Sequence, residues 1–172
     1  MRKENLKGKK IFMTGGTSGL GKEAAIHYAN HGAQLILLAR DEKKSKAIKE
    51  RYNKKYQNGT GTIEIVKGDL NSLDSVKSAC LEVKKNHPTL DYIINNAGIT
   101  RDNLLMRMSE DQWDEVIRVN LKSVFNLVKA STRTFLKQKQ GSIINVTSVV
   151  GIKGNAGQAN YAASKAGIVG FS

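Results

Sequence analysis

The sequence predicts an α/β fold in which helices cover both faces of an open parallel sheet. Strand-like and helix-like segments alternate along the 172 residues, as in doubly wound sheets. Residues 34–39 form a continuous apolar run, which is typical of a strand buried on both faces. A glycine-rich turn at residues 14–21 directly follows the first strand-like run. The length suits one domain, and with one proline and 16 glycines no flexible linker divides it.

Residue periodicity predicts three strand–helix pairs in the first half of the chain. Leu20, Ala24 and Tyr28 recur with the spacing of a helix. Residues 62–66 alternate between two faces, as a strand near the edge of a sheet does. The predicted elements are a strand at 10–13, a helix at 20–29, a strand at 34–39, a helix at 41–56, a strand at 62–66 and a helix at 72–85.

The second half of the chain adds two strands and two helices. A capping-box pattern at residues 109–112 opens a long helix. Its apolar positions run from Trp113 to Leu136 and cover more than one face, so we expect it to pack on the sheet and on a partner helix. The fourth strand is predicted at 92–94, the fifth at 142–146 and a last helix from Asn160 onward.

The chain is strongly basic, with 28 Lys and Arg against 15 Asp and Glu and a formal net charge of +13. One interpretation is a solvated, lysine-rich surface, and another is attraction of acidic ligands such as a phosphorylated cofactor or an acidic carrier protein. Nucleic-acid binding is disfavoured because no aromatic platform or recognition motif accompanies the lysines.

Cysteine usage and apolar runs predict a cytoplasmic protein that binds no membrane. Cys80 is the only cysteine, which excludes an intramolecular disulfide and favours a reducing compartment. No apolar run is long enough to span a bilayer, and the charged residues 1–4 precede no signal-peptide stretch. His27 and His31 have the spacing of a metal-binding pair, but no third ligand is evident, so we expect no metal site there.

The glycine-rich turn predicts a dinucleotide site. Glycines let the backbone turn tightly and approach a pyrophosphate, while amides at the helix N-terminus attract the anion. Any tight strand-to-helix turn can need a glycine, but this turn has the strand–turn–helix context that the site requires. The turn residues expected to bind the cofactor are Gly15, Thr17, Ser18, Gly19, Leu20 and Gly21.

The end of the second strand predicts which nicotinamide cofactor is bound. Arg40 comes first there, and a guanidinium matches the bidentate geometry of a 2′-phosphate. In the alternative interpretation Arg40 is a surface residue, and Asp41, which suits a helix N-cap, contacts the ribose. We prefer NADP(H), and NAD(H) stays open as the alternative.

Two residues one helical turn apart carry the predicted chemistry. Tyr161 and Lys165 share a helix face, where an ammonium stabilises a phenolate and so promotes proton transfer. Ser148 follows the fifth strand, at the rim where such sheets bind ligands, and its hydroxyl suits a substrate carbonyl. Asn120 reaches the same crevice only if the long helix passes it. A tyrosine and a lysine on one helix are commonly surface residues, but their combination with the glycine-rich turn is specific.

Over essentially its whole length the chain resembles the short-chain dehydrogenase/reductase family. The glycine-rich turn, residues 95–98 and the four residues of the preceding paragraph match the signatures of that family. The resemblance implies a Rossmann-like fold and one NAD(P)-binding domain over residues 1–172. The implied roles are Asp69 and Leu70 beside the adenine, Asn96, Ala97 and Gly98 near the cofactor, Tyr161 as proton donor, Lys165 at the nicotinamide ribose and beside Tyr161, Ser148 orienting the carbonyl, and Asn120 holding a proton-relay water.

Three segments resemble one group of the family, the bacterial 3-oxoacyl-[acyl-carrier-protein] reductases. They are residues 99–108, 148–151 and 154–160. This resemblance implies an NADPH-dependent enzyme of fatty acid biosynthesis that reduces a 3-oxoacyl thioester to the 3-hydroxyacyl form. It also implies an acidic acyl carrier protein as partner, with Lys139 where the group has a carrier-docking arginine, and a dimer or tetramer.

The first half of the chain leaves the substrate open. Residues 22–25 and 38–41 look more like retinol-dehydrogenase-type members of the family. The chain is therefore either an unusual natural member or a join of two related sequences near Asn95. Reduction of another ketone, such as a retinoid, a steroid or a sugar, is the alternative activity.

The C-terminal end predicts an incomplete fold. The chain stops inside the helix that carries Tyr161, whereas family members continue with two more strands, a cofactor loop and a substrate lid. We expect a fragment, or the ordered part of a longer protein, with an exposed fifth strand, low stability and feeble catalysis on its own. A cofactor-binding fragment without turnover is a further alternative.

Overall fold

The computed structural model of the protein describes residues 6–56 and 60–172, so the charged residues 1–4 lie outside it. Strands and helices alternate as the sequence predicts. In chain order the elements are β1 Lys10–Thr14, α1 Gly19–Asn30, β2 Gln34–Ala39, α2 Glu42–Lys55, β3 Thr62–Lys67, α3 Leu73–Asn86, β4 Tyr92–Asn95, η1 Leu105–Arg107, α4 Glu110–Val116, η2 Ile117–Lys122, α5 Ser123–Gln138, β5 Ser142–Asn145, α6 Val150–Lys153 and α7 Ala159–Phe171.

The strands form one parallel sheet in the order β3-β2-β1-β4-β5, which confirms the predicted doubly wound fold. The chain builds outward from β1 to β3 on one side and then crosses to β4 and β5 on the other. The order therefore reverses beside β1, where the carboxyl ends of β1 and β4 leave a crevice. The edge position predicted for residues 62–66 is confirmed by β3.

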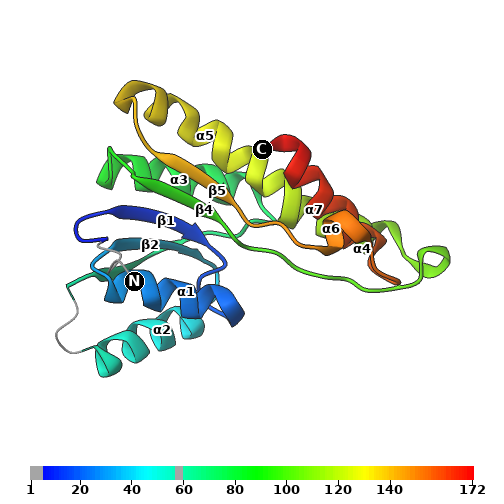
Figure 1. Cartoon of the computed structure of the whole chain (residues 1–172), viewed down its shortest axis with the longest axis horizontal. Coiled ribbons are helices and arrows are strands. Elements are labelled where there is room, and N and C mark those ends of the chain that lie inside the picture. The colour runs from blue at the N-terminus through cyan, green and yellow to red at the C-terminus, as the bar shows by residue number, and fades with distance from the viewer. Residues whose placement is uncertain (1–5, 57–59) are drawn as a thin grey trace.

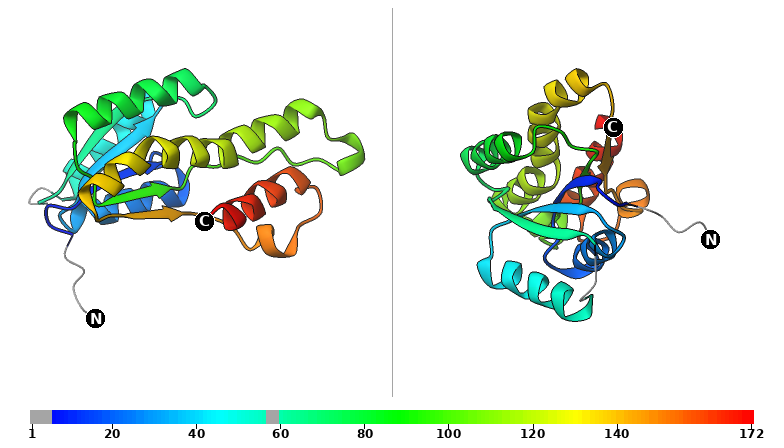
Figure 2. Two further views of the ribbon diagram at one scale, coloured as in Figure 1. Left: turned by 90° about the horizontal axis from the view of Figure 1, so that it is seen from above. Right: turned by 90° about the vertical axis from the view of Figure 1, so that its left-hand side faces the viewer.

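Side chains of the central strands alternate between two cores. Ile11 and Met13 pack with α1 and α2 on one face, whereas Phe12 packs with α3 and α5 on the other. Figure 1 shows these helix pairs on opposite sides of the sheet. Because both faces are covered, the apolar run of β2 has no polar side to present, as its sequence predicts. Figure 2 shows α4, α6 and α7 extending beyond one end of the sheet.

The long predicted helix is present but changes its winding. The capping box at Ser109 and Gln112 begins α4, and the same helix continues through the π-helical turn η2 into α5. The sequence gives no signal for that turn. Trp113 and Leu136 remain 38% and 71% exposed, so much of the second apolar face of this helix is uncovered.

Leu20 lies on α1, as its helical spacing predicts, but it is not part of the core. Its side chain is 90% exposed, and it lies in the first turn of the helix. The exposure agrees with its other predicted role, at the cofactor site.

Three smaller observations concern the cysteine, the histidines and the membrane. Cys80 is half-buried against the core between the sheet and α3. The rings of His27 and His31 lie 4.2 Å apart, and the described residues contain no cluster of three or more His, Cys, Asp or Glu side chains. Within residues 6–56 and 60–172, none of the helices combines the length and apolarity needed to cross a bilayer.

We predict that Leu35→Ala lowers the free energy of unfolding by about 2–5 kcal/mol, because Leu35 is completely buried on β2 and its loss leaves a cavity. Leu81→Ala on α3 is the matched control: Leu81 is 69% exposed, so the expected change is within about 0.5 kcal/mol. Urea denaturation measures both variants. Equal losses would contradict the position of β2 in the core.

Candidate cofactor and catalytic site

A cleft of about 470 Å³ lies over the carboxyl ends of the strands. Its wall contains the residues that the sequence assigns to the cofactor through the glycine-rich turn, the end of β2 and the segments after β3 and β4. These are Gly15, Thr17, Ser18, Gly19, Leu20, Gly21, Arg40, Asp69, Leu70, Asn96, Ala97 and Gly98. Their gathering into one cleft agrees with the predicted dinucleotide site.

The glycine-rich turn leaves an open, anion-attracting surface at the start of α1. Gly15 has a φ of +67°, and a Cβ there would lie 2.7 Å from the Ala97 Cα atom. A Cβ on Gly21 would lie 2.1 Å from the Gly15 carbonyl oxygen, so glycine is required at both positions. Ser18, the N-cap, makes no side-chain capping bond. The first amides of α1 therefore stay available for a phosphate.

Thr14 and Asn96 fasten this turn to the end of β4. The Thr14 hydroxyl accepts hydrogen bonds from the backbone N–H groups of Asn96 and Ala97, both at 3.1 Å. The Asn96 amide donates to the carbonyl oxygens of Thr14 and Gly15 at 3.2 and 3.1 Å. The floor of the cleft is thus cross-linked between two neighbouring strands. Sequence analysis missed the role of Thr14, since it depends on a partner 82 residues away.

The end of the cleft beside β2 carries the residues on which the predicted cofactor choice depends. Asp41 is the N-cap of α2, and its carboxylate accepts a hydrogen bond from the Lys44 backbone N–H at 3.0 Å. That hydrogen bond lowers the pKa of Asp41. The Arg40 side chain is 65% exposed, and its Nη1 atom lies 3.7 Å from Asp69 Oδ2. Both residues line the cleft: Asp41 is bonded to the first turn of α2, and the exposed Arg40 guanidinium lies beside Asp69.

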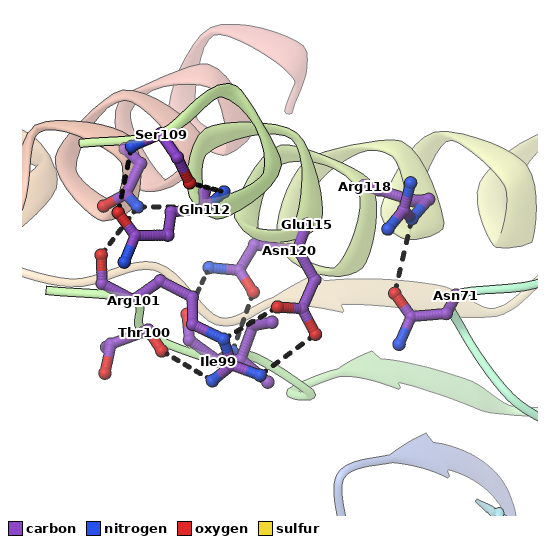
Figure 3. A network of polar contacts seen from close by, with 10 residues as sticks. Asn71, Ile99, Thr100, Arg101, Ser109, Gln112, Glu115, Arg118 and Asn120 are labelled. Carbon is purple, nitrogen blue, oxygen red and sulfur yellow. Dashed lines mark hydrogen bonds and ion pairs between the residues drawn. The ribbon is translucent and has the colours of Figure 1, made fainter.

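The opposite wall of the cleft is closed by a charged pair. Arg101 donates from Nε and Nη2 to the two carboxylate oxygens of Glu115, at 2.7 and 3.0 Å. Farther along the helix, Arg118 donates to the Asn71 side-chain oxygen at 3.3 Å, which ties η2 to the segment after β3. Figure 3 shows both contacts reaching from the long helix toward the strand ends. Neither contact was predicted from the sequence.

Asn120 joins three segments from inside the π-helical turn. Its side chain is fully buried, and its Oδ1 atom accepts the Ile99 backbone N–H at 2.8 Å. Its Nδ2 group donates to the Ile99 carbonyl at 3.0 Å (Figure 3). The same group donates to the Ser164 hydroxyl, also at 3.0 Å. The long helix does pass the crevice, as its predicted role requires. The carboxamide is nevertheless occupied by protein partners, so the role in holding a water stays a prediction.

Tyr161 and Lys165 both lie on α7, one turn apart, and Lys165 is 3% exposed. The Lys165 Nζ atom donates to the Val146 carbonyl at 2.8 Å and lies 5.7 Å from the centre of the Tyr161 ring. Burial lowers the pKa of this lysine. A Cβ on Gly98 would stand 3.5 Å from both Lys165 Nζ and Asn120 Oδ1, so the amine lies directly behind the wall of the cleft.

Ser148 lies in the chain after β5, between two residues that contact Lys165. Its hydroxyl oxygen accepts the Val150 backbone N–H at 3.2 Å, at the start of α6. The preceding residue, Thr147, donates from its hydroxyl to the Lys165 carbonyl at 2.8 Å. A Cβ on Gly151 would stand 2.9 Å from the Lys165 Cβ atom, so α6 packs closely on α7. The four predicted catalytic residues therefore come from segments that meet around Lys165.

Asn160 is a second structural residue that the sequence did not reveal. It is fully buried, and its amide donates to the carbonyl oxygens of Arg101 and Gln112 at 2.9 and 3.1 Å. Its Oδ1 atom accepts the backbone N–H of Tyr161 at 2.7 Å. This asparagine fixes the start of α7 against α4 and so fixes the position of Tyr161 in the first turn of α7.

Comparison with known proteins extends these observations. A family profile described as short chain dehydrogenase matches residues 9–172. The chain is similar to proteins named 3-oxoacyl-[acyl-carrier-protein] reductase FabG. Those of Staphylococcus aureus, Escherichia coli and Vibrio cholerae are 42, 43 and 44% identical to it over 165, 170 and 168 residues, or 95, 98 and 98% of this chain. The similarity thus includes both halves, and the chain spans 65–66% of the length of these relatives.

We predict that Lys165 makes stability depend on pH. Burial lowers the pKa of Lys165 from 10.5 in the folded protein. Between that lowered pKa and pH 10.5 the unfolded chain binds more protons than the folded chain, so the free energy of unfolding rises with pH. Lys165→Met should remove this rise, and Lys153→Met, a change at an exposed lysine of α6, should keep it. Chemical denaturation at a series of pH values measures the difference. Parallel curves for all three proteins would contradict the burial of the amine.

Proposed function

This chain belongs to the short-chain dehydrogenase family, and we propose that its protein is an NADPH-dependent reductase of a 3-oxoacyl thioester. The observation that carries the proposal is the buried Lys165 amine, set beside the Tyr161 ring and directly behind Gly98 in the cleft wall. A lysine excluded from water directly behind the wall of this cleft has no evident purpose in folding. It suits chemistry on a bound cofactor and substrate.

The residues present fit a phosphorylated dinucleotide. The uncapped first turn of α1 suits the pyrophosphate, and the left-handed Gly15 lets the backbone approach it. Arg40 and Lys44 supply cations at the adenosine end, where the 2′-phosphate would lie. NADPH, when bound, supplies the hydride that the carbonyl carbon receives.

The chain itself supplies the proton and the orientation of the carbonyl. In our proposal the Ser148 hydroxyl donates a hydrogen bond to the substrate oxygen, and Tyr161 gives that oxygen its proton as negative charge develops there. Lys165 lies at the nicotinamide ribose and stabilises the phenolate that remains. Its bond to the Val146 carbonyl fixes the position of the amine. The product is the corresponding 3-hydroxyacyl thioester.

The substrate and partner follow from similarity and charge. The relatives' name specifies a 3-oxoacyl group on an acyl carrier protein, and the net charge of +13 favours an acidic partner. Lys139, exposed at the end of α5, is the predicted docking cation. In this proposal the protein acts in fatty acid biosynthesis in the cytoplasm.

Exposed apolar side chains support assembly of several copies. Trp113 on α4 and Phe125 on α5 are 38% and 45% exposed, and Phe171 on α7 is 41% exposed. The rings of Phe125 and Phe171 meet with centres 6.4 Å apart, so α5 and α7 present one shared apolar face. Association through this face into a dimer or tetramer would cover it.

A second candidate activity, reduction of a retinoid or a related ketone, draws support from residues 22–25 and 38–41. A panel of acetoacetyl thioester, retinal, steroid ketones and ketoses separates the two activities. The thioester should give the highest kcat/KM. NADPH binding is measured separately by fluorescence. Binding without turnover of any carbonyl would instead support the alternative of a non-catalytic cofactor-binding protein.

We predict that Tyr161→Phe lowers the rate of NADPH oxidation with acetoacetyl thioester by about 10²–10⁴-fold, because the proton donor is lost. NADPH binding, measured by fluorescence, should be nearly unchanged. Tyr28→Phe is the matched control. Tyr28 lies on α1 and packs against the core, so this variant should leave the rate unchanged. A Tyr161→Phe variant that keeps full activity would sink the proposed mechanism.

We predict that Arg40→Ala raises the KM for NADPH about tenfold and leaves the KM for NADH nearly unchanged, because only NADPH carries the 2′-phosphate. Arg51→Ala is the control: Arg51 also belongs to the α2 region, but it pairs with Glu23 at 2.8 Å, outside the cleft. Steady-state kinetics with both cofactors measure the effect. A wild-type protein with the lower KM for NADH would contradict the preference.

A further inference from the structure

A second cavity lies between α3 and α5, at the opposite end of the sheet from the cofactor cleft. Phe12 and Ile93 form its floor, Cys80 and Val83 one wall, and Leu127 part of the other. About 40 Å³ of it is open to water-sized groups, which is room for roughly three of them. A short apolar chain of a few carbons fits this space, which is narrow for anything larger.

The mouth of this cavity runs into an open, polar groove. Lys84 and Thr134 line both the cavity and the groove, so the two spaces lie side by side. The groove has a volume of about 480 Å³ and passes along the ends of α3 and α5. Gln138 clamps this end of α5 by donating to the Leu90 carbonyl at 2.6 Å and accepting the Leu90 backbone N–H at 3.3 Å. The Gln138 side chain thus holds the end of α5 to the backbone just before β4.

Positive charge at the groove is not balanced by acids. Lys84, Arg133 and Lys137 line it, and no Asp or Glu lines either space. Within residues 6–56 and 60–172 no ion pair involves any of these three side chains. His87 at the cavity wall is different, because its Nε2 atom lies 3.0 Å from Glu64 Oε2. Three cations without an acidic partner, next to an apolar cavity, suit a ligand that joins an anionic group to an apolar tail.

We propose that this paired cavity and groove binds a small anionic amphiphile, with a short alkyl or acyl tail between α3 and α5 and a carboxylate or phosphate head among Lys84, Arg133 and Lys137. The tail buries apolar surface against Phe12 and Leu127, and the head receives charge-assisted hydrogen bonds. The site is separate from the cofactor cleft, with which it shares no lining residue.

Cys80 provides the test, because it is the only cysteine and lines the cavity. Butyrate and butyl phosphate should each slow alkylation of Cys80 by iodoacetamide, about tenfold at saturation. Comparing the two dissociation constants by calorimetry identifies the better-bound head. Butan-1-ol and acetate, which lack the head or the tail, should protect weakly. Equal protection by butan-1-ol, or no protection by either anion, would overturn the proposal.

Two kinds of variant test the head and the tail apart. Arg133→Gln combined with Lys137→Gln should weaken the better-bound anion about tenfold. Lys85→Gln combined with Lys129→Gln removes the same charge from α3 and α5 outside the groove and should leave affinity unchanged. Ala130→Leu keeps every cation and fills the cavity, so it should also abolish protection. Equal affinity in the two double variants, or full binding by Ala130→Leu, would refute the site.

Discussion

The candidate site depends on the burial of one lysine amine. Lys165 is 3% exposed and its Nζ atom donates to one backbone carbonyl, that of Val146. Withdrawing a charged amine from water costs on the order of several kcal/mol, and one neutral acceptor offsets only part of it. The lowered pKa of Lys165 expresses the same cost. The fold tolerates this cost because the elements around the amine are fixed by other contacts.

Two buried asparagines supply those contacts. Asn120 bonds both the N–H and the C=O of Ile99 and holds Ser164 on α7. Asn160 joins the start of α7 to Arg101 and to Gln112 at the head of α4. An apolar side chain at either position would leave several backbone groups buried without partners. These hydrogen bonds therefore hold the segment after β4, the long helix and α7 together, and so fix the positions of Tyr161 and Lys165 on α7.

Local patterns predicted the strands and the longer helices because each of these has a signal of its own, whereas η1, η2 and α6 were not predicted. The continuous apolar run of β2 and the capping box at Ser109 are examples. Each pattern lies within a few consecutive residues and is enough to identify its strand or helix start. The turn residues predicted to bind the cofactor line the cleft for the same reason, since a glycine-rich turn after a strand is a local motif. Thr14, Asn160 and the Arg101–Glu115 pair were missed because the partners in these contacts lie 14 or more residues away. The helical spacing of Leu20 does not reveal that its side chain is exposed.

The distribution of charge distinguishes the two ends of the sheet. In the cofactor cleft the cations Arg40, Lys44 and Arg101 are matched in number by Asp41, Asp69 and Glu115, and each of the acids lies close to one of them. The large basic excess of the chain is therefore not concentrated where a phosphorylated cofactor would bind. At the other end the groove between α3 and α5 has cations alone, next to an apolar cavity. A solvated lysine surface explains scattered charges, but it does not explain why unpaired cations and an apolar cavity share one mouth.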